Sequence, residues 1–283
     1  MDNLIFSILD YFSKSGQKLI HDHQKRLNVE PVYIGTSGWS YKDWGKTFYP
    51  EKLPKKSHFD FYATQFPTVE LNHTFYRLPT EKSVRDWRDK APPGFIYAVK
   101  GSRFITHMKK LSHLDGAVDK FFDRIAPLKQ QIDPILWQLP PFLKKDIPRL
   151  DDFLSALPRD YDYAVEFRNL SWLDDDIFAL LHKHHVAHVN LSSGGMPMNL
   201  TVTADFIYIR FHGLAAGAAH DYTHRELEPW ADFIHHQSRR KVFAYFNNDV
   251  NTRAPDNARM LMDMVGKRVV RASTGSYATI GAT

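Results

Sequence analysis

The chain has 283 residues, and its 43% hydrophobic and 14% aromatic content excludes an intrinsically disordered protein. It has no cysteine, which excludes disulfides, thiolate metal sites and cysteine nucleophiles. The formal net charge of +5 mildly favours anionic partners, and no segment has the roughly 20 consecutive apolar residues of a membrane span, so we expect a cytoplasmic protein without a transmembrane segment.

The first residues predict a helix outside the main domain. Apolar side chains recur at helical spacing in residues 1–12, MDNLIFSILDYF. An acidic residue precedes this run and lysines follow it, which is unlike a secretory signal. We predict an N-terminal amphipathic helix and linker over residues 1–31, docked on a main domain over residues 32–283. A helix for a membrane surface or a protein partner is the alternative.

From residue 32 onward, short segments rich in Val, Ile, Phe and Tyr alternate with longer amphipathic segments. Their mean spacing of about 30 residues is typical of βα units in a parallel sheet. Strands are expected at 32–39, 68–72, 96–102, 134–139, 163–168, 187–193, 206–213 and 242–249. Helices are expected at 56–66, 81–90, 116–131, 148–157, 173–185, 225–239 and 255–265, with a loop at 194–205. We therefore predict an α/β fold, a single closed parallel (β/α)₈ barrel of the TIM type, rather than an open doubly wound sheet with a glycine-rich first turn.

The polar residues of these strands fall mainly on one parity, and the other parity is largely apolar. Since side chains alternate between the two faces of a strand, one face is expected to line the barrel and the other to pack on the helices. The polar residues also concentrate in the C-terminal halves of the strands, and barrel enzymes have their active sites at the carboxyl ends of the strands. The polar set is Thr36, Glu70, Asn72, Lys100, Ser102, Gln138, Glu166, Arg168, His188, Asn190, Ser192, Arg210, His212 and Asn248.

The strand ends and the loops after them read YIGTSGWSYKDW, FYP, VELNHTFYRLP, KGSRFITH, QLPP, VEFRNLSW, YIRFHG and YFNND. Together these motifs resemble the YecE-like family, also called domain of unknown function seventy-two, over residues 32–270. The resemblance implies a (β/α)₈ barrel with a cleft at the carboxyl ends of its strands. It implies no particular activity, and fold alone does not determine one.

Glu70 and Glu166 lie at equivalent depths on the second and fifth strands. Paired carboxylates can act as the acid and base of sugar chemistry. The alternative is that each neutralises a neighbouring cation: Lys100 for Glu70, and Arg168 or Arg210 for Glu166. His107 and His212 are candidate proton shuttles, so the candidate catalytic residues are the two glutamates and these two histidines.

Cations outnumber carboxylates at the expected mouth of the barrel. The cations are Lys100, Arg103, Arg168 and Arg210, and arginine matches phosphate and carboxylate groups through paired donors. We therefore expect an anion near Arg168 and Arg210. The other expected ligand contacts are Trp39, Asn72, Tyr76, Gln138, Asn190 and Asn248. The aromatic residues after the first two strands could stack on a base or sugar, or could simply stiffen the loops.

We expect an enzyme acting on an anionic substrate, phosphorylated or derived from a nucleic acid, and a phosphoester hydrolase or a lyase is the expected class. One alternative is a carbohydrate-active enzyme that uses Glu70 and Glu166. Another is a non-catalytic protein that binds a phosphorylated ligand or single-stranded nucleic acid. No cofactor is expected. A divalent metal held by glutamates and histidines is a weaker alternative, because the lysine and arginines at the mouth would repel it.

Overall fold

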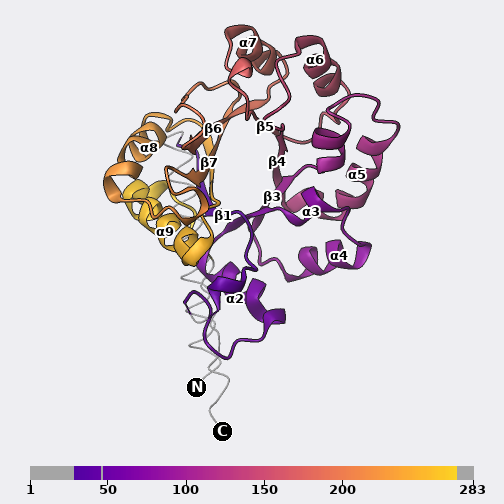
Figure 1. The fold of residues 1–283 in the computed structure, drawn as a ribbon. Helices are drawn as coiled ribbons and strands as arrows, with labels where there is room; N and C mark the ends of the chain where they lie inside the picture. The colour runs from indigo at the N-terminus through magenta and orange to yellow at the C-terminus, as the bar shows by residue number, and fades with distance from the viewer. Residues whose placement is uncertain (1–28, 46, 273–283) are drawn as a thin grey trace.

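The computed structural model describes residues 29–45 and 47–272, so the expected N-terminal helix lies outside the described residues. Eight parallel strands form a ring, and helices surround it (Figure 1). The eight predicted strands are confirmed. They are β1 (Val32–Thr36), β2 (Thr68–Leu71), β3 (Ile96–Lys100), β4 (Ile132–Gln138), β5 (Tyr163–Glu166), β6 (Ala187–Ser193), β7 (Phe206–Gly213) and β8 (Lys241–Phe246).

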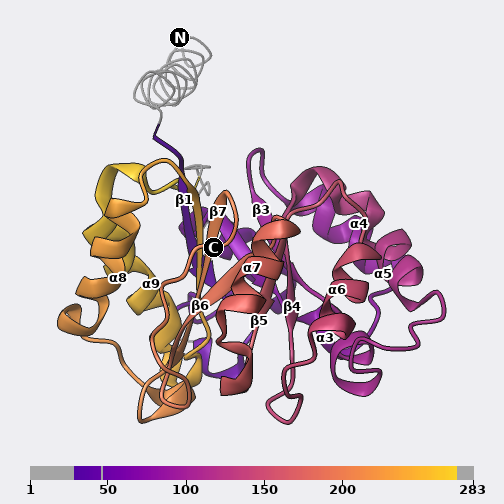
Figure 2. The same ribbon diagram turned by 90° about the horizontal axis from the view of Figure 1, so that it is seen from above.

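The seven predicted helices are also confirmed, and Figure 2 shows helices on both sides of the strands. Local capping fixes several of their ends; α8, for example, begins with a capping box between Thr223 and Glu226. No helix in the described part of the chain is long and apolar enough to cross a membrane. The helices are α2 (His58–Gln65), α3 (His73–Tyr76), α4 (Glu81–Lys90), α5 (Ala117–Ile125), α6 (Ile147–Ser155), α7 (Asp175–Lys183), α8 (His224–His236) and α9 (Arg253–Val265).

Two segments differ from the prediction, and a third, the 194–205 loop, agrees with it. The segment predicted as one helix over 116–131 is α-helical only to Ile125, because Pro127 cannot donate a helical hydrogen bond, and it continues as a 3-10 helix. The short helix α3 was not predicted. The segment 194–205 is a loop, as predicted, so β6 passes to β7 without a helix between them.

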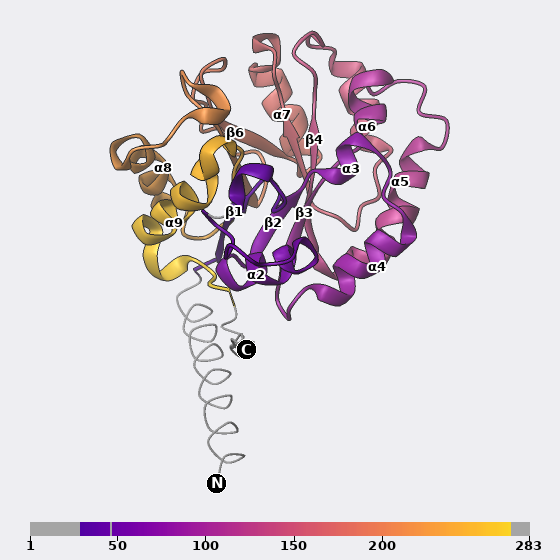
Figure 3. The same cartoon turned by 60° about the horizontal axis from the view of Figure 1, so that its bottom comes forward.

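The barrel closes between β1 and β2 through a side chain. The hydrogen-bonded strand order is β1-β8-β7-β6-β5-β4-β3-β2, so β1 and β2 are its two ends. The Tyr62 hydroxyl, from α2, accepts the Thr36 N–H at 3.0 Å and donates to the Thr68 carbonyl at 3.0 Å. Figure 3 shows α2 beside these two strands. Gly35 permits the close approach, since a Cβ there would lie 2.4 Å from the Thr68 oxygen.

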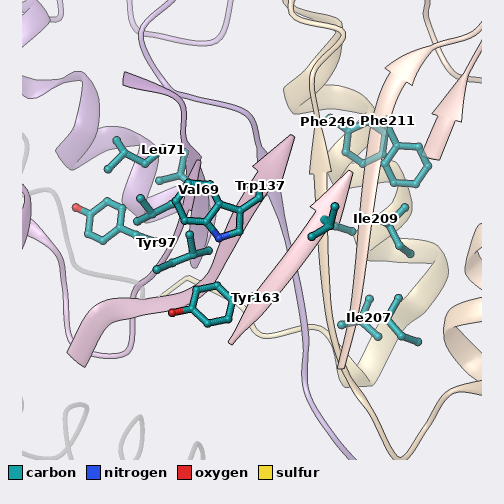
Figure 4. Packing of buried hydrophobic residues seen from close by; sticks show 14 of the residues in the cluster. Val69, Leu71, Tyr97, Trp137, Tyr163, Ile207, Ile209, Phe211 and Phe246 are labelled. Carbon is teal, nitrogen blue, oxygen red and sulfur yellow. The ribbon is translucent and has the colours of Figure 1, made fainter. Parts of the chain in front are cut away.

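Two apolar clusters separate the inside of the barrel from its outside. The outer cluster packs the sheet on the helices and includes Trp137, Ile209 and Phe211 (Figure 4). The inner cluster fills the barrel with small and aromatic side chains. Its members are Ala98, Leu136, Ala164, Ala187, Val189, Leu191, Ala204, Phe206, Tyr208, Phe243 and Tyr245. The polar mouth therefore lies above a packed floor.

The predicted parity is wrong on β6, at the end of β1 and after β8, where Asn248 bonds to His220 and Asn257. The His188 ring packs against Phe167 and Phe178, on the outer side of the sheet. The Asn190 amide donates to carbonyls of the 194–205 loop, and Thr36 bonds to the Tyr62 hydroxyl. The inward residues of β6 are the apolar ones of the inner cluster, because a polar loop rather than a helix covers the outer face here.

Candidate functional site

A buried arginine bridges two buried glutamates at the centre of the mouth. Arg210 Nη2 donates to Glu70 Oε1 at 2.6 Å, and Nη1 donates to Glu166 Oε2 at 2.5 Å. The Tyr208 hydroxyl donates to Glu70 Oε2 at 2.8 Å. All three charged side chains have essentially no exposed surface. We call Glu70, Arg210 and Glu166 the central triad.

Arg168 and Gln138 complete the surroundings of Glu166. Arg168 Nε lies 2.5 Å from Glu166 Oε1, and Gln138 Nε2 donates to the same oxygen at 2.6 Å. Two arginines therefore face two glutamates, and every carboxylate oxygen has a donor. The Arg168 side chain is 27% exposed, unlike that of Arg210, and its Nη2 lies 3.3 Å from His212 Nε2.

The central triad keeps both glutamates ionised. Burial alone would raise the pKa of Glu70, but Arg210 and Lys100 outweigh it and lower that pKa. For Glu166 burial again acts upward, and Arg210 and Arg168 hold the pKa well below its ordinary value. Ionised carboxylates cannot donate protons, so the geometry favours the ion-pair interpretation of these residues over an acid and base pair.

His212 lies beside the triad as a neutral imidazole. Its Nε2 is 2.9 Å from Arg210 Nη1, and Asn247 Nδ2 is 3.0 Å from its Nδ1. Burial and the Arg210 charge lower the pKa of His212 to about 4, although Glu166 acts in the opposite direction. At neutral pH this ring therefore carries no positive charge and is a weak base.

Lys100 lies on the other side of the mouth, at the end of β3. Its Nζ is 4.1 Å from the centre of the Phe75 ring, and no ion pair joins it to a carboxylate in the described part of the chain. Burial and Arg210 lower its pKa to about 7, against the attraction of Glu70 and Glu166. His107, in the π-helix Phe104–Met108, packs edge-on against Phe75 at 5.1 Å.

A cavity of about 470 Å³ opens beside Arg168 and His212. Asn247 and the loops after β6 and β7 form the rest of its lining. Gly213 makes the turn after β7 possible: its φ is +85°, and a Cβ would lie 1.8 Å from the Gly217 carbonyl oxygen. Loops after the last strands of a barrel often hold phosphate groups, so this is a suitable place for an anion.

The remaining predicted contacts divide between the mouth and other positions. Asn72 donates to the Ser37 carbonyl at 3.1 Å, while its amide oxygen is buried without a partner. Trp39, in the loop after β1, packs on Phe59 of α2. Two residues reach solvent at the mouth: Arg103, which is exposed, and Tyr76, which is 67% exposed.

Asn190 and Asn248 do not reach the cavity. Asn190 holds the 194–205 loop, and the Asn248 amide donates to the His220 carbonyl and to Asn257. The neighbouring Asn247 lines the cavity instead, and the sequence analysis missed it. Tyr245 faces into the barrel, and residues two apart on a strand share a face, so counting from Tyr245 would have selected Asn247. No group of three or more metal-ligating side chains is assembled among the residues described.

Comparison with known proteins places this barrel in a family. The family model described as "Protein of unknown function DUF72" matches residues 33–278. Over 142 residues, 49% of this chain, it is 34% identical to the UPF0759 protein YecE of Escherichia coli (strain K12), and the match spans only 48% of that protein's length. Over 269 residues it is 24% identical to the UPF0759 protein YunF of Bacillus subtilis (strain 168), spanning 94% of that protein.

Solved structures show the same fold. A DUF72 family protein from Thermotoga maritima superposes with a TM-score of 0.77 at 29% identity, covering 83% of this chain and 99% of the other. A DUF72 family protein from Enterococcus faecalis superposes with a TM-score of 0.69 at 18% identity, covering 83% and 95%. The family model spans most of the chain. The chain therefore belongs to the DUF72 family.

Proposed function

We propose that this protein is an enzyme that binds a small anionic substrate, phosphorylated or carboxylated, in the cavity beside Arg168. The observation that carries the proposal is the difference between the two arginines. Arg210 is enclosed and has both terminal nitrogens bonded to glutamates, whereas the Arg168 side chain is 27% exposed and lines the cavity. The anion contact that the sequence suggested for both arginines is therefore assigned to Arg168 alone.

The charges around the mouth support an anionic ligand. Arg168 and Arg210 offset Glu70 and Glu166, and the nearby Arg103 has no ion pair in the part of the chain that the structure describes. A bound phosphate or carboxylate would supply the negative charge that balances Lys100 and Arg103, which have no ion pair in the described residues. Paired N–H donors of arginine fit such oxygens, and charge-assisted contacts are about twice as strong as neutral ones.

The protonation states favour a lyase over a phosphoester hydrolase. Lowered pKa values make Glu70, Glu166 and His212 weak bases and leave none of them protonated as an acid at neutral pH. Lys100, with its pKa lowered to about 7, can accept a proton there, and a lyase that begins by removing a proton next to a carbonyl needs such an acceptor. The carbohydrate alternative has less support, since Glu70 and Glu166 are both engaged by Arg210 and have no exposed surface.

Thermal unfolding with inorganic phosphate tests the anion site. A ligand that binds only the native state raises Tm, by an amount equivalent to about 2.7 kcal/mol at 100 times Kd. Phosphate should raise the Tm of the wild type more than sodium chloride of equal ionic strength, and that of Arg168→Gln much less. Arg85→Gln, at an exposed arginine on α4, is the matched control and should respond as the wild type does. Equal responses of wild type and Arg168→Gln would remove Arg168 from the site.

Single-stranded nucleic acid is a second candidate ligand, because exposed apolar side chains gather around the mouth. Among the described residues, every exposed large apolar side chain lies in a segment that follows the carboxyl end of a strand. They are Tyr76, Leu78, Phe104, Met108, Phe142, Leu170, Met198, Leu200 and Val250. Aromatic side chains beside cations are typical stacking platforms for bases, and Lys110 lies 5.4 Å from the Phe142 ring.

Fluorescence anisotropy with a labelled oligonucleotide separates the two candidates. Binding that weakens steeply between 50 and 200 mM salt, and weakens further in Phe104→Ala/Phe142→Ala, would support the nucleic acid. Leu170→Ala is the control for loss of exposed apolar area without loss of an aromatic ring. Absence of binding at about 50 mM salt would end this candidate.

A further inference from the structure

No carboxylate oxygen near the Lys100 amine is free to pair with it. The two glutamates near it have every oxygen engaged: Arg210 and Tyr208 contact Glu70, and Arg210, Arg168 and Gln138 contact Glu166. The lysine is only 7% exposed. Its Nζ instead faces the ring of Phe75 at 4.1 Å, and that ring offers no acceptor oxygen.

The charged groups around Lys100 nearly balance, so burial decides its protonation. Glu70 and Glu166 favour the ammonium form, while Arg210 and Arg168 oppose it. His107 faces Phe75 from the π-helix after β3, and its own pKa is lowered by burial and by Lys100 and Arg103. With its pKa lowered to about 7, about half of Lys100 is neutral at pH 7. A freely exposed lysine is neutral in only about one molecule in 2,500 at that pH.

We propose that Lys100 is the nucleophile of this site and forms an imine with the carbonyl carbon of a small anionic aldehyde or ketone. The location is that of a catalytic group, at the carboxyl end of a barrel strand beside a partly exposed imidazole. A desolvated, neutral amine is the reactive form of lysine toward carbonyl groups. The inference rests on the proposed function in one respect, namely that the anionic group of the same substrate binds at Arg168.

The reaction balances without a further reagent. The neutral amine attacks the carbonyl carbon, a C–N bond forms, and the electron pair of the C=O bond moves to oxygen. The nitrogen loses a proton and the oxygen gains one, and His107, which contacts the same Phe75 ring as Lys100, is the candidate to carry it. A proton from solvent on the resulting hydroxyl then lets water leave as the C=N bond forms, so one amine, one carbonyl and one proton give one protonated imine and one water. The protonated imine carries a positive charge where Glu70 and Glu166 favour one.

Reductive trapping tests the proposal on the full chain. The protein is incubated at pH 7 with sodium cyanoborohydride and either glyceraldehyde 3-phosphate or glyceraldehyde, and adducts are located by peptide mass spectrometry. Lys82, whose side chain is 79% exposed on α4, is the internal comparison. We expect Lys100 to be modified at least about tenfold faster than Lys82 by the phosphorylated aldehyde, because its neutral fraction is so much larger. Lys100→Arg should lose this rapid adduct, and Lys82→Arg should keep it.

The two aldehydes distinguish failure of the imine from failure of the anion site. A preference of Lys100 for the phosphorylated aldehyde that disappears in Arg168→Gln supports both proposals, provided that the variant melts cooperatively. Rapid modification of Lys100 by both aldehydes, unchanged in Arg168→Gln, supports the nucleophile and overturns the Arg168 anion site. Modification of Lys100 by either aldehyde at or below the rate of Lys82 overturns the nucleophile.

Discussion

Replacing Arg210 with methionine removes the guanidinium that bridges two buried carboxylates. Methionine fills a similar length of the barrel interior without charge. Glu166 keeps Arg168 and Gln138, but Glu70 keeps only the Tyr208 hydroxyl, so the uncompensated charge falls mainly on Glu70. Removing one partner of a buried ion pair costs about 3–5 kcal/mol. For a domain of this size, that loss lowers Tm by about 6–20 °C.

The loss of unfolding free energy in Arg210→Met should be larger at pH 7 than at pH 5. In the wild type the pKa of Glu70 is lowered, so its contribution to stability is present above the unfolded-state pKa of about 4.3 and is lost as pH falls through the lower folded value. Without Arg210, burial should raise the pKa of Glu70 above that of the unfolded chain. The native variant then takes up a proton between pH 7 and pH 5, which stabilises it, so the deficit relative to wild type should be smaller at pH 5.

Urea unfolding followed by circular dichroism at both pH values measures this deficit. Arg85→Met is the matched control, since Arg85 is exposed and pairs with Glu81 along α4. Surface pairs of this kind contribute less than about 1 kcal/mol. A loss below about 1 kcal/mol for Arg210→Met at pH 7, or an equal loss at pH 5 and pH 7, would refute the reasoning about the central triad.

Three further substitutions test other parts of the structure. Tyr62→Phe should cost about 1–3 kcal/mol and speed hydrogen exchange of the Thr36 amide, because buried polar groups of two strands lose their partner; unchanged exchange measured by NMR would contradict this. Lys100 has a folded pKa of about 7 against about 10.4 when unfolded, so wild type should gain stability between pH 7 and pH 10 relative to Lys100→Met; parallel urea stability profiles would contradict it. Gly213→Ala should abolish the Tm shift caused by phosphate, since a Cβ would lie 1.8 Å from the Gly217 oxygen; a preserved shift would count against the cavity.

The sequence contains strong information about the strands and weaker information about their faces. Each strand of the barrel was predictable because apolar runs and punctuating prolines recur at the period of a βα unit. Glu70, Lys100, Glu166 and Arg210 were assigned to the correct face, because clear apolar residues alternate with them. On β6 polar and apolar residues alternate regularly, so the sequence allows either set to face inward. The structure shows that Val189 and its apolar neighbours belong to the inner cluster.

The pairing within the mouth was harder to predict than its composition. Arg210 reaches Glu70 from β7 to β2 across the barrel, and no spacing in the sequence encodes that distance. The choice between Asn247 and Asn248 likewise depends on where β8 ends and on the contacts of Asn248 with Asn257. Burial of Lys100 under Phe75 depends on α3, a helix too short to be recognised from its pattern.

The 194–205 loop differs from the other connections in what its release would cost. Hydrogen bonds hold it to β6: Asn190 donates to the carbonyls of Asn199 and Thr201, and Thr203 donates to the Val186 carbonyl. Met198 and Leu200 are already exposed, whereas Val202 and Ala204 pack on the two apolar clusters. Release of residues 194–201 would therefore uncover amide groups but little apolar area, and such an opening should have a small m-value and persist with little change as urea is added. Since residues 194 and 195 line the cavity, one of its walls can open while the rest of the barrel stays folded.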